Sequence, residues 1–289
     1  MATTVYTVYG RPSSLNAIKV FVMIEECEGV ECDLVHASGW LAPGANVYSY
    51  HAGETYDDRK WEKLVDSQAY RDLNPNPTVP TMLLPEEAGG GALFESNVIV
   101  RYLARKHAPA LLGDAGTPEA AARAEVWMDW QTAGSWRNHA KGGGKGASSV
   151  AVLHDNVVRL PPDRRAACGA ILDAAVAAAE ALGLLEAQLG KAPFLGGERF
   201  TVADIPMGTM VARFKVSLEK AVEIHGAASF DLARLPPTPN IDRWWAALQE
   251  RPGFFRGCVI PERMHAGLPV AAELPAWYKA YNRRYGLTT

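Results

Sequence analysis

Segments with the pattern of β-strands are confined to the first hundred residues of this chain. Four short runs rich in β-branched, aromatic and leucine residues lie at 5–10, 31–37, 81–85 and 91–95. Helical patterns separate or follow these runs at 14–29, 66–73 and 96–107. Beyond them only helical patterns of useful length occur. This order predicts an α/β domain joined to an all-helical domain rather than one continuous α/β sheet.

Long helical segments dominate the second part of the chain. A Thr-Pro start signal opens one at Thr117, and an Ala/Leu-rich segment closed by glycine covers 161–190. In "FTVADI", Thr201 can cap a helix with Asp204 at the third helical position. We expect an α/β domain over 1–108 and an all-helical domain with an extended tail over 117–289.

Composition narrows the class of protein. The 289 residues are 48% hydrophobic and 21% charged, and the formal net charge of −3 gives no reason to expect nucleic-acid binding. The most apolar stretch, 166–189, is interrupted by three acidic residues, so we expect no membrane span. The cysteines have no metal-binding or redox spacing: Cys27, Cys32, Cys168 and Cys258. We therefore predict a cytoplasmic protein without a metal site.

Three prolines lie within six positions in "LNPNPTVPTML", residues 73–83. Pro80 directly precedes a strand-like run, although proline cannot donate to a sheet ladder and belongs at a strand's first residue or on an edge. This placement leaves two readings open. Pro80 either blunts an edge strand or leaves the backbone before it free to pair with a ligand.

Four motifs in register resemble the cytosolic glutathione transferase superfamily. They are "LNPNPTVPTML", "LFESNVIVRYL", "FLGGERFTVADI" and "IDRWWAALQERPGF". The resemblance implies a thioredoxin-like N-terminal domain, an all-α C-terminal domain and glutathione as cosubstrate. It also implies a homodimer. We expect a bacterial serine- or asparagine-type member of this superfamily, with the β-etherases as one specific possibility.

The resemblance gives the residues around Pro80 a ligand. In the family the matching proline is cis, and the residue before it pairs through its backbone with the cysteinyl part of glutathione. Thr78, Val79 and Pro80 are therefore expected to bind glutathione. Pro77 departs from the glycine that many relatives have at this position.

The γ-glutamyl end of glutathione is expected at Glu95 and Ser96. Ser96 precedes a helical pattern and can act as its N-cap, and a helix N-terminus suits a carboxylate. Glu95 can meet the ammonium group on the same carbon. Spacing alone favours a role of the two residues at the helix end only; the resemblance favours glutathione binding instead.

A hydroxyl that activates the glutathione thiol is expected in "RPSSLNAIKV", residues 11–20. With a pKa of about 8.5, only about 3% of a free thiol is ionised at pH 7. A hydroxyl that donates to the thiolate contributes about 1.5–3 kcal/mol, a shift of one to two pKa units. Ser14 is the first candidate, and Ser13 and Asn16 are alternatives. Ser13 or Ser14 could also act only as a helix cap.

The pocket for the second substrate is expected between the domains. Trp127, Trp130 and Arg137 are its candidate lining residues, although helical spacing favours the core for the two tryptophans. The long segment 39–66 and the tail after Pro261 are candidates for a lid.

We therefore predict a glutathione S-transferase that acts on a small hydrophobic or aromatic electrophile by conjugation, ether cleavage or dehalogenation. Two alternatives stay open at this point. One is a glutathione-dependent disulfide reductase, favoured if Asn16 contacts sulfur. The other is a non-catalytic binding protein with the same fold.

Overall fold

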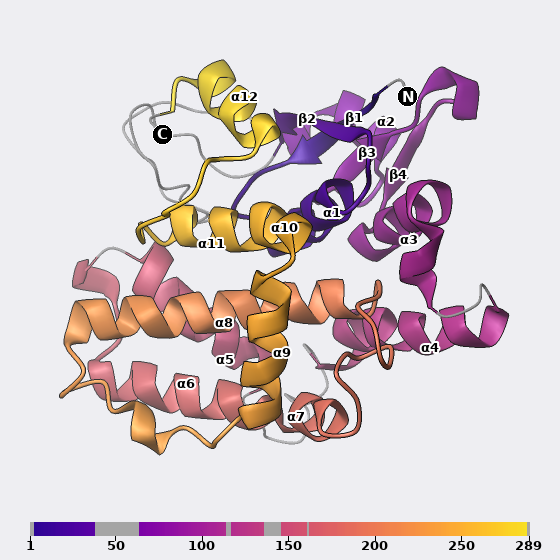
Figure 1. The fold of residues 1–289 in the computed structure, drawn as a ribbon. Helices are drawn as coiled ribbons and strands as arrows, with labels where there is room; N and C mark the ends of the chain where they lie inside the picture. The colour runs from indigo at the N-terminus through magenta and orange to yellow at the C-terminus, as the bar shows by residue number, and fades with distance from the viewer. Residues whose placement is uncertain (1–2, 38–63, 114–116, 136–145, 161, 288–289) are drawn as a thin grey trace.

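The computed structural model describes residues 3–37, 64–113, 117–135, 146–160 and 162–287. A four-stranded sheet and its helices form one part of the molecule, and helices alone form the other (Figure 1). The predicted fold class, a thioredoxin-like α/β domain followed by a helical domain, is confirmed. Most of the predicted long segment 39–66 lies outside the described residues.

The sheet has the strand order β2-β1-β3-β4. Its strands are β1 (Thr4–Gly10), β2 (Val30–His36), β3 (Thr81–Leu83) and β4 (Ala92–Phe94). β1 and β2 are parallel, with Thr4 opposite Val30, whereas β3 is antiparallel to both β1 and β4. All four strands lie within two residues of the predicted runs at their N-terminal ends, and β3 and β4 are shorter than predicted.

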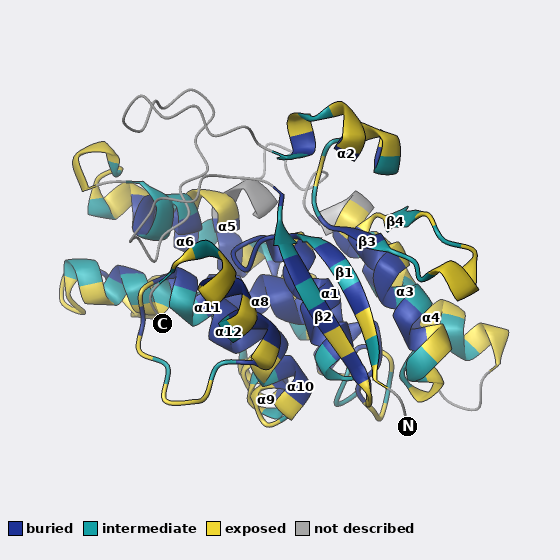
Figure 2. Cartoon of the chain, turned by 90° about the horizontal axis from the view of Figure 1, so that it is seen from above, coloured by how far each residue is buried: buried dark blue, intermediate teal, exposed yellow. Residues whose placement is uncertain are grey.

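Helices cover both faces of the sheet. They are α1 (Leu15–Glu25), α2 (Gln68–Leu73) and α3 (Ser96–His107). In Figure 1, α1 and α3 lie between the sheet and the helical domain, whereas α2 lies on the opposite side. Figure 2 shows α1 and α8 as buried elements beneath the strands.

The helical domain is built around one long central helix, α8 (Asp204–His225). The other α-helices are α4 (Pro118–Asp129), α5 (Gly146–His154), α6 (Cys168–Ala181), α7 (Gly183–Leu189), α9 (Pro239–Gln249), α10 (Pro252–Phe254), α11 (Ile260–His265) and α12 (Ala276–Tyr285). Three π-helical segments continue them: η5 (Trp130–Ser135), η7 (Asp155–Arg159) and η10 (Phe255–Val259). By length and composition, 168–189 could cross a membrane. In the fold it forms α6 and α7, and 44% of its most apolar window is buried.

The helical domain packs directly on α1. A Cβ atom on Gly257 would lie 2.5 Å from Cα of Val22, so only glycine permits this approach of η10 to α1. On the other side of the sheet region, α12 lies along the edge strand β2. Its Tyr285 hydroxyl accepts a hydrogen bond from the His36 backbone N–H at 2.9 Å, and Arg284 donates to the Leu34 carbonyl at 3.1 Å. The tail thus covers a sheet edge, which proteins must otherwise protect from further pairing.

The helix α8 starts two residues later than predicted. The helix begins at Asp204, not after a cap at Thr201. The predicted interaction survives, because the fully buried Asp204 carboxylate accepts from the Thr201 N–H at 2.9 Å. It also accepts from the Leu195 N–H and the Trp244 indole N–H, each at 2.9 Å. One carboxylate therefore joins α8, α9 and the loop before α8.

Replacing this carboxylate tests how far the helical domain depends on it. Asp204→Ala leaves at least three buried donors without an acceptor, so we expect the free energy of unfolding to fall by about 3 kcal/mol or more. Asp242→Ala is the control, because Asp242 is a half-exposed carboxylate in the first turn of α9 that pairs with Lys215. Its loss should cost less than about 1 kcal/mol in denaturant titrations. Equal losses would contradict the role given to Asp204.

Candidate glutathione site

The loop before β3 contains a residue whose backbone groups are unpaired within the described residues. The Val79–Pro80 peptide bond is cis, as the resemblance implied. The preceding carbonyl, that of Thr78, accepts from the Tyr70 hydroxyl at 2.6 Å and from the Asn74 amide at 3.1 Å. Within the described residues, the half-buried Val79 has no hydrogen bond to its N–H or C=O. Tyr70 and Asn74 therefore fix the loop at Thr78, whereas the N–H and C=O of Val79 stay available for a ligand.

A strained residue lies at the start of α3. Glu95 is the one non-glycine residue with positive φ in the described chain, with φ 67° and ψ 108°. Such a conformation costs on the order of 1–3 kcal/mol and clusters at functional sites. The expectation that Ser96 is the N-cap is wrong. Glu95 occupies that position and its carbonyl accepts from the N–H of Val98 at 2.9 Å, whereas Ser96 is the first helical residue.

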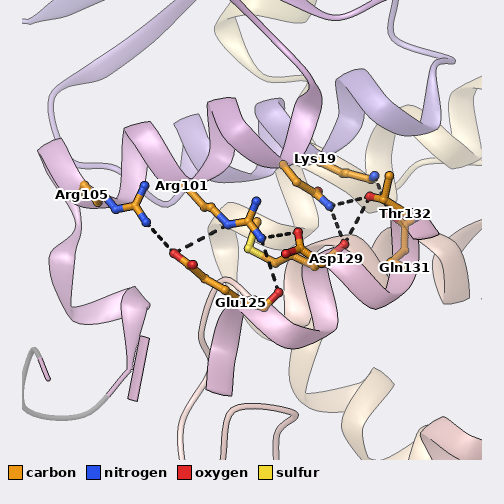
Figure 3. Close-up of polar contacts among 9 residues, drawn as sticks. Lys19, Arg101, Arg105, Glu125, Asp129, Gln131 and Thr132 are labelled. Carbon is orange, nitrogen blue, oxygen red and sulfur yellow. Dashed lines mark hydrogen bonds and ion pairs between the residues drawn. The ribbon is translucent and has the colours of Figure 1, made fainter. Parts of the chain in front are cut away.

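A buried lysine lies directly under this helix start. Lys19 of α1 is 1% exposed, and its ammonium group donates to the Gln131 side-chain oxygen at 2.7 Å and to Ser96 Oγ at 3.4 Å. Figure 3 shows Lys19 reaching across to Gln131 on the segment that continues α4. Burial lowers the pKa of Lys19 to about 7, although the charge of Glu95 acts in the opposite direction. Ser96 therefore accepts a hydrogen bond from Lys19, whose ammonium group loses its proton near neutral pH.

The polar contacts around Lys19 also fix α3 against the helical domain. Asn97 donates to the Met128 carbonyl at 2.6 Å and to Thr132 Oγ1 at 2.9 Å. Farther along α3, Arg101 pairs with Asp129 at 2.5 Å (Figure 3). The helix start that presents Glu95 and Ser96 is thus anchored to α4 and η5.

The first strand-to-helix turn contains the three candidate activating residues. Ser14 is the N-cap of α1, and its hydroxyl oxygen accepts from the Ala17 N–H at 3.4 Å. Accepting that bond leaves the hydroxyl proton free to be donated. Ser13 is 2% exposed and its Oγ has no hydrogen-bond partner in the described structure. Asn16 is exposed on the first turn of α1.

The candidate pocket tryptophans lie beside the α3 start. Trp127 and Trp130 make an edge-to-face contact with ring centroids 5.5 Å apart, and both pack partly buried against the main core. Met128 lies between the two tryptophans in the chain and contacts Asn97 of α3. Gln131 follows Trp130 and contacts Lys19 of α1. Arg137, the third predicted pocket residue, lies outside the described residues.

Sequence reasoning missed a buried polar cluster where the first turn meets the helical domain. Arg213 of α8 donates to both carboxylate oxygens of Glu262 at 2.7 and 3.2 Å, and to the Ser13 carbonyl at 2.9 Å. His265 lies one turn beyond Glu262 on α11, and its ring centroid lies 5.3 Å from that of His154. The i, i+3 spacing of Glu262 and His265 is the available signal in the sequence, but this segment was predicted only as part of an extended tail.

A surface groove of about 1170 Å³ lies elsewhere. Its lining includes Glu25, Cys27 and Trp277, at the C-terminal end of α1. Ser14 is at the opposite end of this helix, so the groove is separate from the candidate site. Among the described residues, no group of three or more His, Cys, Asp and Glu side chains is placed to hold a metal ion.

The structure has a thioredoxin-like domain with a helical domain beside it. Comparisons with known proteins identify the class. Family models described as glutathione S-transferase match at residues 50–106 for the N-terminal domain and 147–247 for the C-terminal domain. The chain belongs to the glutathione S-transferase family, and its cosubstrate is glutathione.

Individual relatives agree with this assignment. Glutathione S-transferase GstB of Escherichia coli is 29% identical over 265 residues, which cover 88% of this chain and 98% of that protein. Glutathione S-transferase 4 of Zea mays is 27% identical over 253 residues, covering 87% and 91%. The theta class enzyme of Xanthomonas axonopodis pv. citri, solved with glutathione bound, is 31% identical with a TM-score of 0.59, covering 87% of this chain and 96% of that one.

The depressed pKa of Lys19 makes stability depend on pH in a predictable direction. In the unfolded chain a lysine titrates near pH 10.4, so above about pH 7 the unfolded state binds more protons than the folded state. The free energy of unfolding should therefore gain about 1 kcal/mol per pH unit from Lys19 between about pH 7.5 and pH 9.5. In Lys19→Met this contribution is absent.

Denaturant titrations at several pH values measure the difference between wild type and variant. Lys215→Met is the control, because Lys215 is a partly exposed lysine paired with Asp242 and its removal should give a curve parallel to wild type. A Lys19→Met curve that also runs parallel to wild type would show that Lys19 stays protonated throughout this range.

Proposed function

We propose that this transferase binds glutathione along the edge formed by Val79, Glu95 and Ser96 and activates its thiol at Ser14. The observation that carries the proposal is the loop before β3, because within the described residues neither the N–H nor the C=O of Val79 has a hydrogen bond. A tripeptide pairs with such an edge through its own backbone. Thr78 and Pro80 shape the loop on either side of Val79.

The groups at the α3 start and at the first turn support one orientation of bound glutathione. The γ-glutamyl carboxylate would meet the N-terminus of α3 at Ser96, beneath which Lys19 supplies a donor, and its ammonium would meet the exposed Glu95. The strained backbone of Glu95 holds its carboxylate at this helix start. The cysteinyl sulfur then lies toward the first turn, where Ser14 retains a hydroxyl proton to donate.

We propose that the thiolate attacks a hydrophobic or aromatic electrophile. Conjugation, aryl-ether cleavage and dehalogenation share this first step. The edge-to-face pair of Trp127 and Trp130 supports an apolar wall near the α3 start. The four cysteines are free thiols in the structure, which agrees with a reducing compartment such as the cytosol.

Substitution of the proposed activating hydroxyl tests the assignment. Ser14→Ala should raise the pKa of the bound glutathione thiol by about one unit or more, because a charge-assisted hydrogen bond to the thiolate is lost. The pH dependence of the thiolate's ultraviolet absorbance in the complex measures this pKa. Glutathione affinity, measured by calorimetry, should change only a few-fold.

Ser13→Ala and Asn16→Ala are matched controls in the same turn and should leave the thiol pKa unchanged. If one of them raises the pKa and Ser14→Ala does not, that residue is the activating group. Calorimetry with oxidised glutathione completes the test. Preferential binding of the oxidised form would favour a disulfide reductase over the transferase proposed here.

We further propose that the protein is a homodimer that associates through the face of β4, α3 and α4. Large apolar side chains are exposed on this face: Phe94 on β4, Val98 on α3 and Val126 on α4 are 36%, 43% and 60% exposed. α3 and α4 form a continuous surface there, because Arg101 pairs with both Glu125 and Asp129. An isolated monomer rarely leaves such residues grouped on one face.

A charge on this face should disrupt association. Val126→Glu is expected to convert dimers to monomers in light scattering coupled to size-exclusion chromatography, because burying a carboxylate in an apolar interface is costly. Leu184→Glu is the control, since Leu184 on α7 is similarly exposed at 52% and lies outside this face. A monomeric wild type, or a Val126→Glu protein that stays dimeric, would contradict the proposed interface.

A further inference from the structure

The Arg213 guanidinium reaches from the middle of α8 to the turn that precedes α1. Its Nη2 donates to the Ser13 carbonyl at 2.9 Å and to Glu262 Oε1 at 2.7 Å, and its Nε donates to Glu262 Oε2 at 3.2 Å. Arg213 and Glu262 are 6% and 0% exposed. Because 200 positions separate Arg213 from Ser13, this contact attaches the turn to the helical domain and is not a product of local structure.

The contact acts on the peptide unit that joins Ser13 to Ser14. The C=O of this unit accepts from Arg213, and its N–H, that of Ser14, donates to the Arg11 carbonyl at 3.1 Å. The Ser14 carbonyl in turn accepts from the Ile18 N–H at 2.9 Å in the first turn of α1. Both polar groups of the peptide unit are therefore held, and with them the direction in which the Ser14 side chain leaves the backbone. That direction matters because a hydrogen bond weakens steeply as its angle departs from linear.

A bidentate arginine–carboxylate pair is suited to fixing a backbone group. The guanidinium is planar and its donors have a fixed geometry, so two bonds to Glu262 leave little freedom for the bond to Ser13. Buried ion pairs, however, are often no more stabilising than apolar residues of similar volume. The pair is therefore better explained by the turn that it holds in place than by the stability that it adds.

We propose that Arg213, oriented by Glu262, is a positioning residue that sets the Ser14 hydroxyl for donation to the glutathione thiolate. The inference rests on the proposed function, since it assumes that the thiol is activated at this turn. Arg213 acts through the backbone of the turn and not on the sulfur itself. The helical domain thereby takes part in thiol activation, although the serine belongs to the thioredoxin-like domain.

Arg213→Lys tests the proposal with the buried charge retained. Lysine keeps a cation beside Glu262 but lacks the planar fork that serves both the carboxylate and the Ser13 carbonyl. We expect the pKa of the bound glutathione thiol, measured from thiolate absorbance, to rise by about 0.5–1 unit. Since the charge is retained, such a rise reports a misplaced hydroxyl and not a lost positive potential. Glutathione affinity in calorimetry should stay within a few-fold of wild type.

A double variant, Arg213→Met with Glu262→Met, removes the pair without leaving an unpaired buried charge. Because apolar replacement of a buried ion pair is often neutral or stabilising, the midpoint of denaturant unfolding should stay at or above that of wild type. The thiol pKa should nevertheless rise as in Arg213→Lys. A pair with a purely structural role would shift the midpoint and leave the thiol pKa unchanged.

Arg263 and Glu219 provide a matched control between the same two helices. Arg263 of α11 donates to both carboxylate oxygens of Glu219 on α8, at 2.6 and 2.9 Å, and to the Pro269 carbonyl at 2.9 Å. It thus makes the same kinds of contact as Arg213, with the Pro269 carbonyl in place of the first turn. The double variant Arg263→Met with Glu219→Met should leave the thiol pKa at its wild-type value.

The outcomes separate the inference from the function on which it rests. An unchanged thiol pKa in the Arg213 variants would overturn the inference, and so would an equal rise in the control double variant. Either Arg213 variant decides the question alone if the other does not fold. Failure of the proposed function would look different. The thiol in the wild-type complex would then titrate as in free glutathione, or none of Ser14→Ala, Ser13→Ala and Asn16→Ala would raise its pKa.

Discussion

The burial of α1 between the sheet and the helical domain is the constraint on which the rest of the structure depends. Apart from Asn16, every residue from Leu15 to Ile24 is buried. Such a helix can pack on both sides only if its neighbours approach closely, as Gly257 does against Val22. The same constraint means that any polar group on α1 must find its partners inside the protein.

Two buried cations connect α1 and the turn before it to neighbouring elements. Both make hydrogen bonds at places where glutathione chemistry is proposed. Lys19 crosses from α1 to Ser96 on α3 and to Gln131 on η5. Arg213 crosses from α8 to the Ser13 carbonyl at the turn before α1. Because the two cations act at different points of the proposed ligand path, loss of one need not disturb the other. The domain boundary is thereby held together by the same groups that border the site.

The sequence predicted the parts of the structure that depend on local pattern. Strand runs and helix starts were found because alternation, caps and glycine stops act over a few residues. The cis bond before Pro80 followed from a resemblance, since no local rule separates a cis proline from an edge-strand proline. The positive φ of Glu95 had no sequence signal at all, because glutamate is rarely found in that conformation.

Contacts between distant segments were beyond sequence reasoning for a different reason. Asp204 was identified as part of a capping interaction, but its bond to the Trp244 indole depends on where α9 packs. Arg213 and Glu262 are 49 positions apart, and no local rule connects them. A cation in a buried helix is expensive unless it is paired, so an isolated Arg or Lys within an apolar pattern, as at Lys19 and Arg213, is itself an indication of a long-range partner. Such a residue is better interpreted as a charge in need of a partner than as a solvated position on a helix face. Interpreted in this way, Lys19 and Arg213 can be identified in the sequence as charges that need a partner, although the partner itself is given only by the fold.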